Sequence, residues 1–201
     1  MRSKGAIALL AVVLIVGFAG CAGCNTYNSL VAAEERVETA WANVETQYQR
    51  RADLIPNLVS TVQGAADFEQ ETLQAVTDAR AKATSINLDV SDLNSPQRLQ
   101  QFQQAQQQLS GALGRLLAVS ENYPELRATE AFRDLQAQLE GTENRINVAR
   151  RDYNESVRQY NTTIRQFPTV IVASLAGFDR RAPFEAEAGA EEAPDVDFSG
   201  N

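Results

Sequence analysis

The 201-residue sequence contains no histidine, and its only cysteines are Cys21 and Cys24. The lack of histidine excludes imidazole acid–base catalysis, Ser-His-Asp triads and histidine metal ligands. Both cysteines lie at the end of an N-terminal apolar run, so the rest of the chain has no disulfide, no thiolate nucleophile and no cysteine zinc site. We therefore expect no cofactor and no bound metal.

Proline, glycine and basic residues are also scarce. Six prolines and eleven glycines are few for a β-protein with frequent turns, whereas Ala, Gln, Glu, Arg and Leu, all good helix formers, dominate. The formal net charge of −8 argues against nucleic-acid binding, which requires a basic surface. The composition therefore predicts an all-α protein with no nucleic-acid partner.

One long apolar run, residues 5–24 (GAIALLAVVLIVGFAGCAGC), follows the basic residues Arg2 and Lys4. About 20 apolar residues suffice for a membrane-spanning helix, but a basic start and a small-residue end are also typical of a signal peptide. Residues 18–21 (FAGC) resemble a bacterial lipobox, although Phe18 stands where that motif usually has leucine. We predict that residues 1–24 are an N-terminal membrane anchor or a lipoprotein signal. Cys21 is the lipidation candidate, and a plain signal anchor with unmodified cysteines is the alternative.

The basic residues around this run predict which side of the membrane holds the body. Arg2 and Lys4 precede the run, and no base follows it until Arg36. Because basic residues near a segment's end are retained on the cytoplasmic side, we expect an extracytoplasmic body.

Apolar residues recur at alternating steps of three and four along the rest of the chain, which is typical of helices packed on helices. The longest such segment is residues 129–167, and the others are residues 27–51, a segment ending near 85, and residues 96–120. Pro56 predicts a tight turn over residues 53–57, with one continuous helix kinked at Pro56 as the alternative. The glutamines of residues 97–108 are expected to face solvent. Together these segments predict an antiparallel up-and-down four-helix bundle over residues 25–178, behind the N-terminal membrane segment.

The sequence after the last long helix has two parts. The apolar run of residues 169–178 is too short to span a membrane and would either cover the end of the bundle or dock on a surface. From Glu185 onward the chain has six acids and no base. This composition predicts an acidic disordered tail over residues 179–201.

Several motifs carry a resemblance to a known family. They are residues 50–59 (RRADLIPNLV), Glu69 followed by Ala79-Arg80, residues 141–168, and residues 27–30 (YNSL). Over about residues 27–178 the chain resembles the LemA family of bacterial membrane proteins. The resemblance implies an antiparallel four-helix bundle behind a short membrane segment, and it implies no defined reaction. The family has been described with its body inside the cell, which leaves a cytoplasmic body as the alternative.

The chain departs from the family pattern at two positions. Ala52 and Phe68 stand where many members have histidine. Any role of the family that rests on those histidines therefore cannot operate in this protein.

A polar cluster is the candidate site. It would either bind an anion or a protein partner, or serve only as helix caps and ion pairs that fix helix register. Its members are Arg50, Arg51, Asp53, Glu69, Arg80, Arg145, Arg150 and Arg151.

These features predict a membrane-tethered, non-enzymatic scaffold or adaptor of the bacterial envelope, with an envelope protein of unknown identity as its partner. The alternatives are a membrane-remodelling coiled-coil protein and an enzyme built from carboxylates alone. Such an enzyme would need two acids that face one cleft and have separated pKa values.

Overall fold

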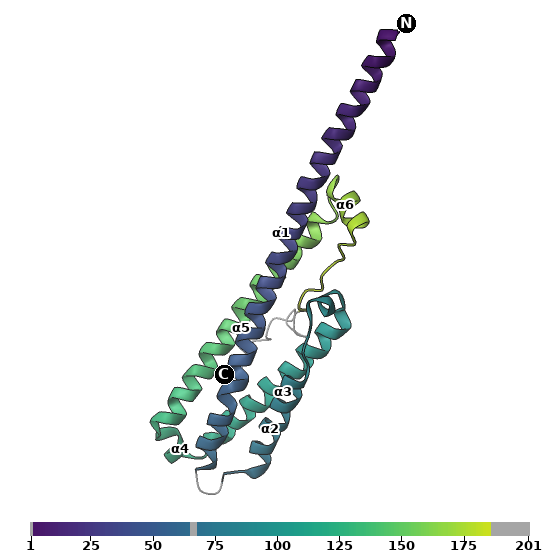
Figure 1. Ribbon diagram of the computed structural model, residues 1–201. Helices are drawn as coiled ribbons and strands as arrows, with labels where there is room; N and C mark the ends of the chain where they lie inside the picture. The colour runs from purple at the N-terminus through teal and green to yellow at the C-terminus, as the bar shows by residue number, and fades with distance from the viewer. Residues whose placement is uncertain (1, 65–67, 186–201) are drawn as a thin grey trace, which may run out of the picture.

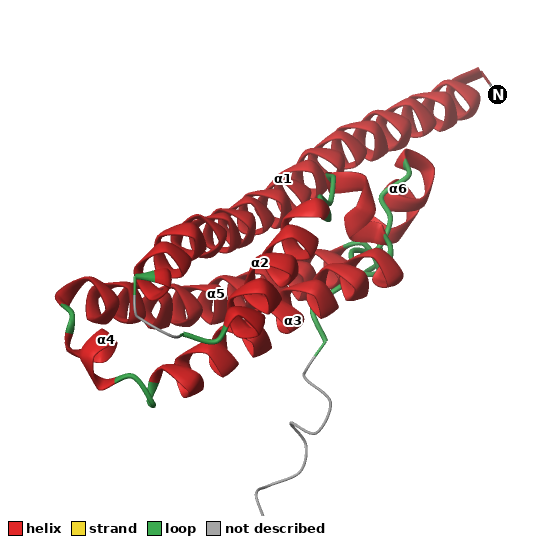
Figure 2. Cartoon of the chain, turned by 90° about the horizontal axis from the view of Figure 1, so that it is seen from below, coloured by secondary structure: helices red, strands yellow, loops and turns green. Residues whose placement is uncertain are grey.

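The described part of the chain is helical. In the computed structural model residues 2–64 and 68–185 are described, although the side chains of residues 2–8 and 10–22 are not. No strand occurs in these ranges, so the all-α prediction is confirmed for them (Figure 2). The elements are α1 (Arg2–Gln63), α2 (Gln70–Ser85), the 3₁₀ helix η1 (Val90–Asn94), α3 (Pro96–Ser120), α4 (Pro124–Ala128), α5 (Glu130–Thr163) and α6 (Thr169–Ala176).

The long helices associate as two pairs. Helix α1 packs along α5, α2 packs along α3, and α1 also contacts α2. The short helix α4 contacts both α3 and α5 at the end farthest from the N-terminus (Figure 1). Successive long helices run in alternating directions, and the N-terminal part of α1 projects beyond the other helices (Figure 1).

The predicted turn at residues 53–57 is wrong, because α1 continues through Pro56 to Gln63. Proline has no N–H, so it leaves the carbonyl of Ala52, four residues earlier, without its helical donor. Arg80 on α2 supplies the missing bond, since its Nε donates to the Ala52 carbonyl at 2.8 Å. Ile55 and Leu58 stay buried on either side of the proline. The chain reverses only after α1, and α2 begins at Gln70.

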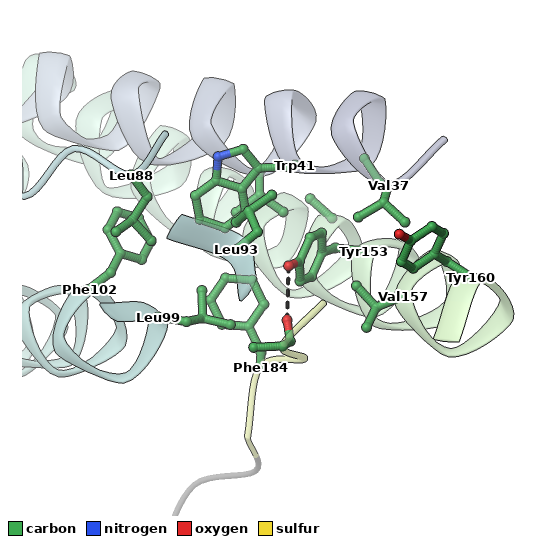
Figure 3. Close-up of a cluster of buried hydrophobic side chains, with 14 of the residues drawn as sticks. Val37, Trp41, Leu88, Leu93, Leu99, Phe102, Tyr153, Val157, Tyr160 and Phe184 are labelled. Atoms are coloured by element: carbon green, nitrogen blue, oxygen red, sulfur yellow. Dashed lines mark hydrogen bonds between the residues drawn. The ribbon is translucent and has the colours of Figure 1, made fainter. Parts of the chain in front are cut away.

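The core consists of two apolar clusters along the bundle axis. The cluster nearer the N-terminal projection centres on Trp41, whose ring lies 5.6 Å from that of Phe102 and 5.5 Å from that of Tyr153, between ring centroids (Figure 3). The second cluster includes Ile55, Leu58, Leu109, Leu116, Phe132 and Leu139. Between the two clusters, each of three long helices carries one buried polar residue. These residues are Arg51 on α1, Gln106 on α3 and Thr142 on α5, and together they form a polar layer.

The C-terminal boundary differs from the predicted one. The tail was expected from residue 179, but Ala182 and Phe184 are buried in the first cluster. Phe184 stacks on Trp41 at 5.9 Å, so an aromatic contact draws this segment into the core. We call residues 181–185 the C-terminal strap. Residues 186–201, the remainder of the predicted tail, lie outside the described residues.

The predicted anchor is described only in part. The backbone from Arg2 onward belongs to α1, whereas the side chain of Cys21 lies outside the description. Among the residues whose side chains the structure describes, which exclude most of the apolar run, no helix is both long enough and apolar enough to cross a bilayer.

A double-mutant cycle tests the link between Pro56 and Arg80. We expect Arg80→Met to lower the free energy of unfolding by about 1–3 kcal/mol, because it leaves the buried Ala52 carbonyl without a donor. In a Pro56→Ala background the new N–H supplies that bond, so the same change should cost less than about 1 kcal/mol. Urea melts of the four proteins measure both values.

Lys82→Met, at an exposed position on the same helix, is the matched control and should change stability by no more than about 0.5 kcal/mol. An equal cost of Arg80→Met in both backgrounds would contradict this account of α1.

Candidate functional site

Arg51 is the central residue of the polar layer that separates the two core clusters. Its side chain is 2% exposed. One terminal nitrogen, Nη1, donates to Ser110 Oγ on α3 at 2.8 Å and to Glu143 Oε2 on α5 at 2.9 Å. The other, Nη2, donates to Gln106 Oε1 at 2.6 Å and to the Gln106 carbonyl at 3.3 Å. One guanidinium on α1 therefore connects α1 to α3 and α5.

Gln106 extends this network to the remaining long helix. While its Oε1 accepts from Arg51, its Nε2 donates to the Ala83 carbonyl on α2 at 3.3 Å. A buried charge is tolerated only when it is paired and hydrogen-bonded, and a network that spans four helices favours one helix register over others. Arg51 Nε has no hydrogen-bond partner among the described residues, so the guanidinium retains one free donor.

A polar pocket of about 450 Å³ opens beside this network between α1, α3 and α5. It is lined by Tyr48, Arg51, Gln103, Gln106, Gln107, Ser110, Glu143 and Arg150. Burial raises the pKa of the Tyr48 hydroxyl, which keeps it protonated at neutral pH, while Arg150 and Arg51 act in the opposite direction. The lining thus combines two cations and several neutral polar groups with one carboxylate, a composition suited to holding an anion or a polar peptide.

The C-terminal strap reaches the rim of this pocket. The Asn161 side chain pairs with both the N–H and the carbonyl of Arg181, and the Asn154 side chain pairs in the same way with Phe184. The Glu185 carbonyl accepts from Gln103 at 3.0 Å and from Arg150 at 3.4 Å, and both of these residues line the pocket. The strap therefore lies as an extended chain along α5 and ends at the pocket.

Further contacts hold the strap, among them hydrogen bonds to α5 and to α1. The Tyr153 hydroxyl donates to the Ala182 carbonyl at 2.9 Å, and burial raises the pKa of this tyrosine, which keeps the donor protonated (Figure 3). Arg181 is buried and donates to Glu34 Oε1 on α1 at 2.6 Å. Both ends of the strap are thus fixed by charged or amide groups of the bundle.

The eight residues of the predicted polar cluster do not form one site. Arg51 and Arg150 line the pocket, and the Arg150 guanidinium also lies 4.8 Å from the centre of the Phe184 ring. Arg80 lies apart from the pocket and bonds the Ala52 carbonyl. Glu143, which is not a member of the predicted cluster, pairs with Arg51.

The other members of the cluster are scattered. Asp53 accepts from Gln49 within α1 at 2.7 Å, and Glu69 accepts from Thr72 at 3.2 Å. Arg50 and Arg145 line a separate pocket of about 330 Å³, and Arg151 is exposed on α5.

Sequence reasoning missed several pocket residues. Gln103 and Gln106 were expected to face solvent, but both are buried. The signal was present for Gln106, because it lies four residues after Phe102 and three before Leu109, on the inward line of the helix. No local pattern distinguishes Ser110 or Glu143 from the exposed polar residues around them.

Among the described residues, the pocket-lining acids Glu143 and Glu45 lie in different pockets. Glu143 is the one carboxylate among the described residues that line the Arg51 pocket. Burial raises the pKa of Glu45, but this residue lines a different, smaller pocket of about 80 Å³. Paired acid–base chemistry needs two acids at one cleft, and these two line different pockets.

The fold and the site together define a class of protein: an all-helical protein in which a single long N-terminal helix enters a bundle tied together by a buried arginine. The chain belongs to the LemA family, whose sequence profile matches residues 40–198.

Three relatives illustrate the breadth of this group. Magnetosome protein MamQ 2 of Paramagnetospirillum magneticum is 27% identical over 199 residues, which cover 90% of this chain and 72% of that protein. Protein LemA of Metamycoplasma hominis is 26% identical over 146 residues, covering 73% of this chain and 63% of that protein. Magnetosome protein MamQ of Magnetospirillum gryphiswaldense is 25% identical over 170 residues, covering 77% of this chain and 62% of that protein. None of these names specifies a reaction.

A second double-mutant cycle tests the coupling between Arg51 and Glu143. Glu143→Ala should lower the free energy of unfolding by about 1–3 kcal/mol, because it leaves a buried guanidinium without its anionic partner. The Glu143 side chain is 46% exposed, so water can enter the site, and the cost should stay below the full penalty for a buried pair. In an Arg51→Met background the same change should cost almost nothing, as measured by urea melts.

Glu140→Ala, at an exposed position one turn before Glu143, is the control and should be close to neutral. Additive effects of Arg51→Met and Glu143→Ala would show that this pair is not coupled.

Proposed function

We propose that the protein is a membrane-tethered, non-enzymatic scaffold or adaptor of the bacterial envelope. Its body would work as an antiparallel four-helix bundle held at the membrane by residues 1–24. The observation that carries the proposal is the continuity of α1, which includes both the apolar run of residues 5–24 and the core residues from Leu30 to Val62.

The dimensions of α1 fit this role. At 1.5 Å per residue, its 62 residues measure about 93 Å. The twenty residues of the apolar run account for about 30 Å, the thickness of a bilayer's hydrocarbon core. Because no flexible linker separates the run from the body within α1, the bundle would be held at a defined height and orientation above the membrane.

The adaptor role is supported by the Arg51 pocket. Its two arginines, its glutamines and its protonated tyrosine suit a carboxylate-bearing or polar segment of an envelope protein. Since Arg51 lies 27 residues beyond Cys24 on the same helix, the pocket would stand about 40 Å from the edge of the hydrocarbon core. A partner at that height would be a peripheral protein or the extramembrane part of a membrane protein.

Two features of the tether belong to the same proposal. Arg2 and Lys4 favour an extracytoplasmic body, with a cytoplasmic body as the alternative. Cys21 is the candidate for lipidation, with an unmodified signal anchor as the alternative. A membrane-remodelling role and a carboxylate-only enzyme remain the alternative functions.

The tether is tested by placing charge in the apolar run of the full-length chain. The native chain should sediment with bacterial membranes and resist a carbonate wash. The double variant Val13→Arg/Leu14→Arg should lose this property, because each charge at the centre of a span costs about 2.5–3.5 kcal/mol. Val148→Arg is the matched control, since Val148 is an exposed apolar residue on α5 and its substitution should leave the membrane fraction unchanged.

Intact mass of the native chain and of Cys21→Ala then identifies the type of anchor. Loss of a lipid-sized mass in Cys21→Ala supports a lipoprotein, and an unchanged membrane-bound protein supports a signal anchor. A native chain that remains soluble in lysates would refute the tether.

A further inference from the structure

Helix α6 leaves large apolar side chains uncovered. Leu175 is 85% exposed, Ile171 is 54% exposed, and Phe167, just before the helix, is 82% exposed. Ile171 and Leu175 are four residues apart and therefore lie along one side of α6, while Phe167 is exposed just before the helix begins. On the other side Ala173 is buried and Val172 packs against the first core cluster. The helix is thus attached to the body by one face and presents its apolar face outward.

The position of α6 relative to the apolar run is fixed by α1. The Phe178 ring, just after α6, packs edge-on against the Tyr27 ring with centroids 5.7 Å apart. Tyr27 is three residues beyond Cys24, the last residue of the run, which corresponds to about 4.5 Å along the helix. Figures 1 and 2 both show α6 at the end of the body from which the N-terminal part of α1 projects.

The height of α6 above the end of the apolar run coincides with the headgroup layer of a bilayer. If residues 5–24 fill a hydrocarbon core of about 30 Å, the headgroup layer occupies roughly the next 5–7 Å on each side. Tyr27 then lies at headgroup level, where tyrosine is enriched in membrane proteins. The half-exposed side chains of Tyr27 and Val31 extend the apolar surface from α1 toward α6.

We infer that α6 is an interfacial docking helix whose Phe167, Ile171 and Leu175 face inserts into the surface of the bilayer that holds the apolar run. This inference rests on the proposed tether. The helix itself carries no charge; the exposed Arg165 precedes it, and the exposed Asp179 and Arg180 follow it. An apolar face whose nearby charges include two bases and one acid suits the surface of a membrane that contains anionic lipids.

Docking at α6 adds a second attachment to the membrane. A single spanning helix leaves the body free to rotate about the helix axis and to tilt. Contact at α6 removes this freedom, so the Arg51 pocket would face a constant direction relative to the bilayer.

Quenching by brominated lipid tests this contact in the full-length chain. The chain, and its variants Leu175→Trp and Val148→Trp, are reconstituted into phosphatidylethanolamine–phosphatidylglycerol vesicles with either native or brominated acyl chains. Val148 is a matched control because it is an exposed apolar residue of α5, 45% exposed, and lies farther along the bundle from α6. The native Trp41 is buried in the core, so the signal of the unsubstituted chain provides the background.

The inference predicts several-fold stronger quenching, with blue-shifted emission, for Leu175→Trp than for Val148→Trp. Equal quenching of the two variants in chains that float with the vesicles would overturn the α6 contact and leave the tether intact. Chains that fail to float would overturn the tether, and the α6 contact with it. A blue shift without bromine quenching would show that a second copy of the chain covers α6, which also overturns the inference.

Discussion

The hydrogen bond from Arg80 to the Ala52 carbonyl is the interaction on which the rest of the structure depends. Pro56 removes the donor that would normally close this turn of α1, and a side chain from α2 replaces it. The same bond fastens α2 to α1 where the two helices lie side by side. As a result α1 contributes to both core clusters, from Val37 in the first to Leu58 in the second, without a break.

A second constraint acts across the bundle instead of along it. Arg51 interrupts the core at the level where α1, α3 and α5 all place a polar residue inward, and Gln106 relays the network to α2. Apolar residues of similar volume could give equal or greater stability at such a layer. The hydrogen bonds of this polar layer can all form in only one register of the helices. The layer therefore contributes more to selecting that arrangement than to its stability. The same layer leaves room for the polar pocket and for the end of the strap.

The sequence predicted the helical class and most helix positions because three-four spacing reflects burial directly. The predicted turn at Pro56 was wrong because local rules describe the donor that a proline removes and cannot include a replacement donor from α2. The predicted solvent exposure of Gln106 was also wrong, because composition suggested an exposed face although the spacing suggested burial. The strap could not be predicted, because the aromatic contact of Phe184 with Trp41 joins residues 143 positions apart in the sequence.

The candidate site shows the same limits. Arg51 and Arg150 were identified as candidates, but their partners come from other helices and carry no local motif. The structure accordingly divides the predicted polar cluster into a buried network, a helix-closing bond at Arg80 and several exposed side chains. Of these, only the surroundings of Arg51 form a pocket that also includes a buried charge.

The central claim is that one uninterrupted helix joins the apolar run to the Arg51 layer and continues past Pro56. Amide hydrogen exchange of the full-length chain tests it most directly at Leu54 and Ile55. In a continuous helix these amides donate to the carbonyls of Arg50 and Arg51, so their protection should match that of Val44 in the middle of α1. If a new helix began with Asp53 as its N-cap, both amides would lie in its first turn without backbone acceptors. Exchange at Leu54 and Ile55 as fast as in the loop between α2 and η1 would contradict the account.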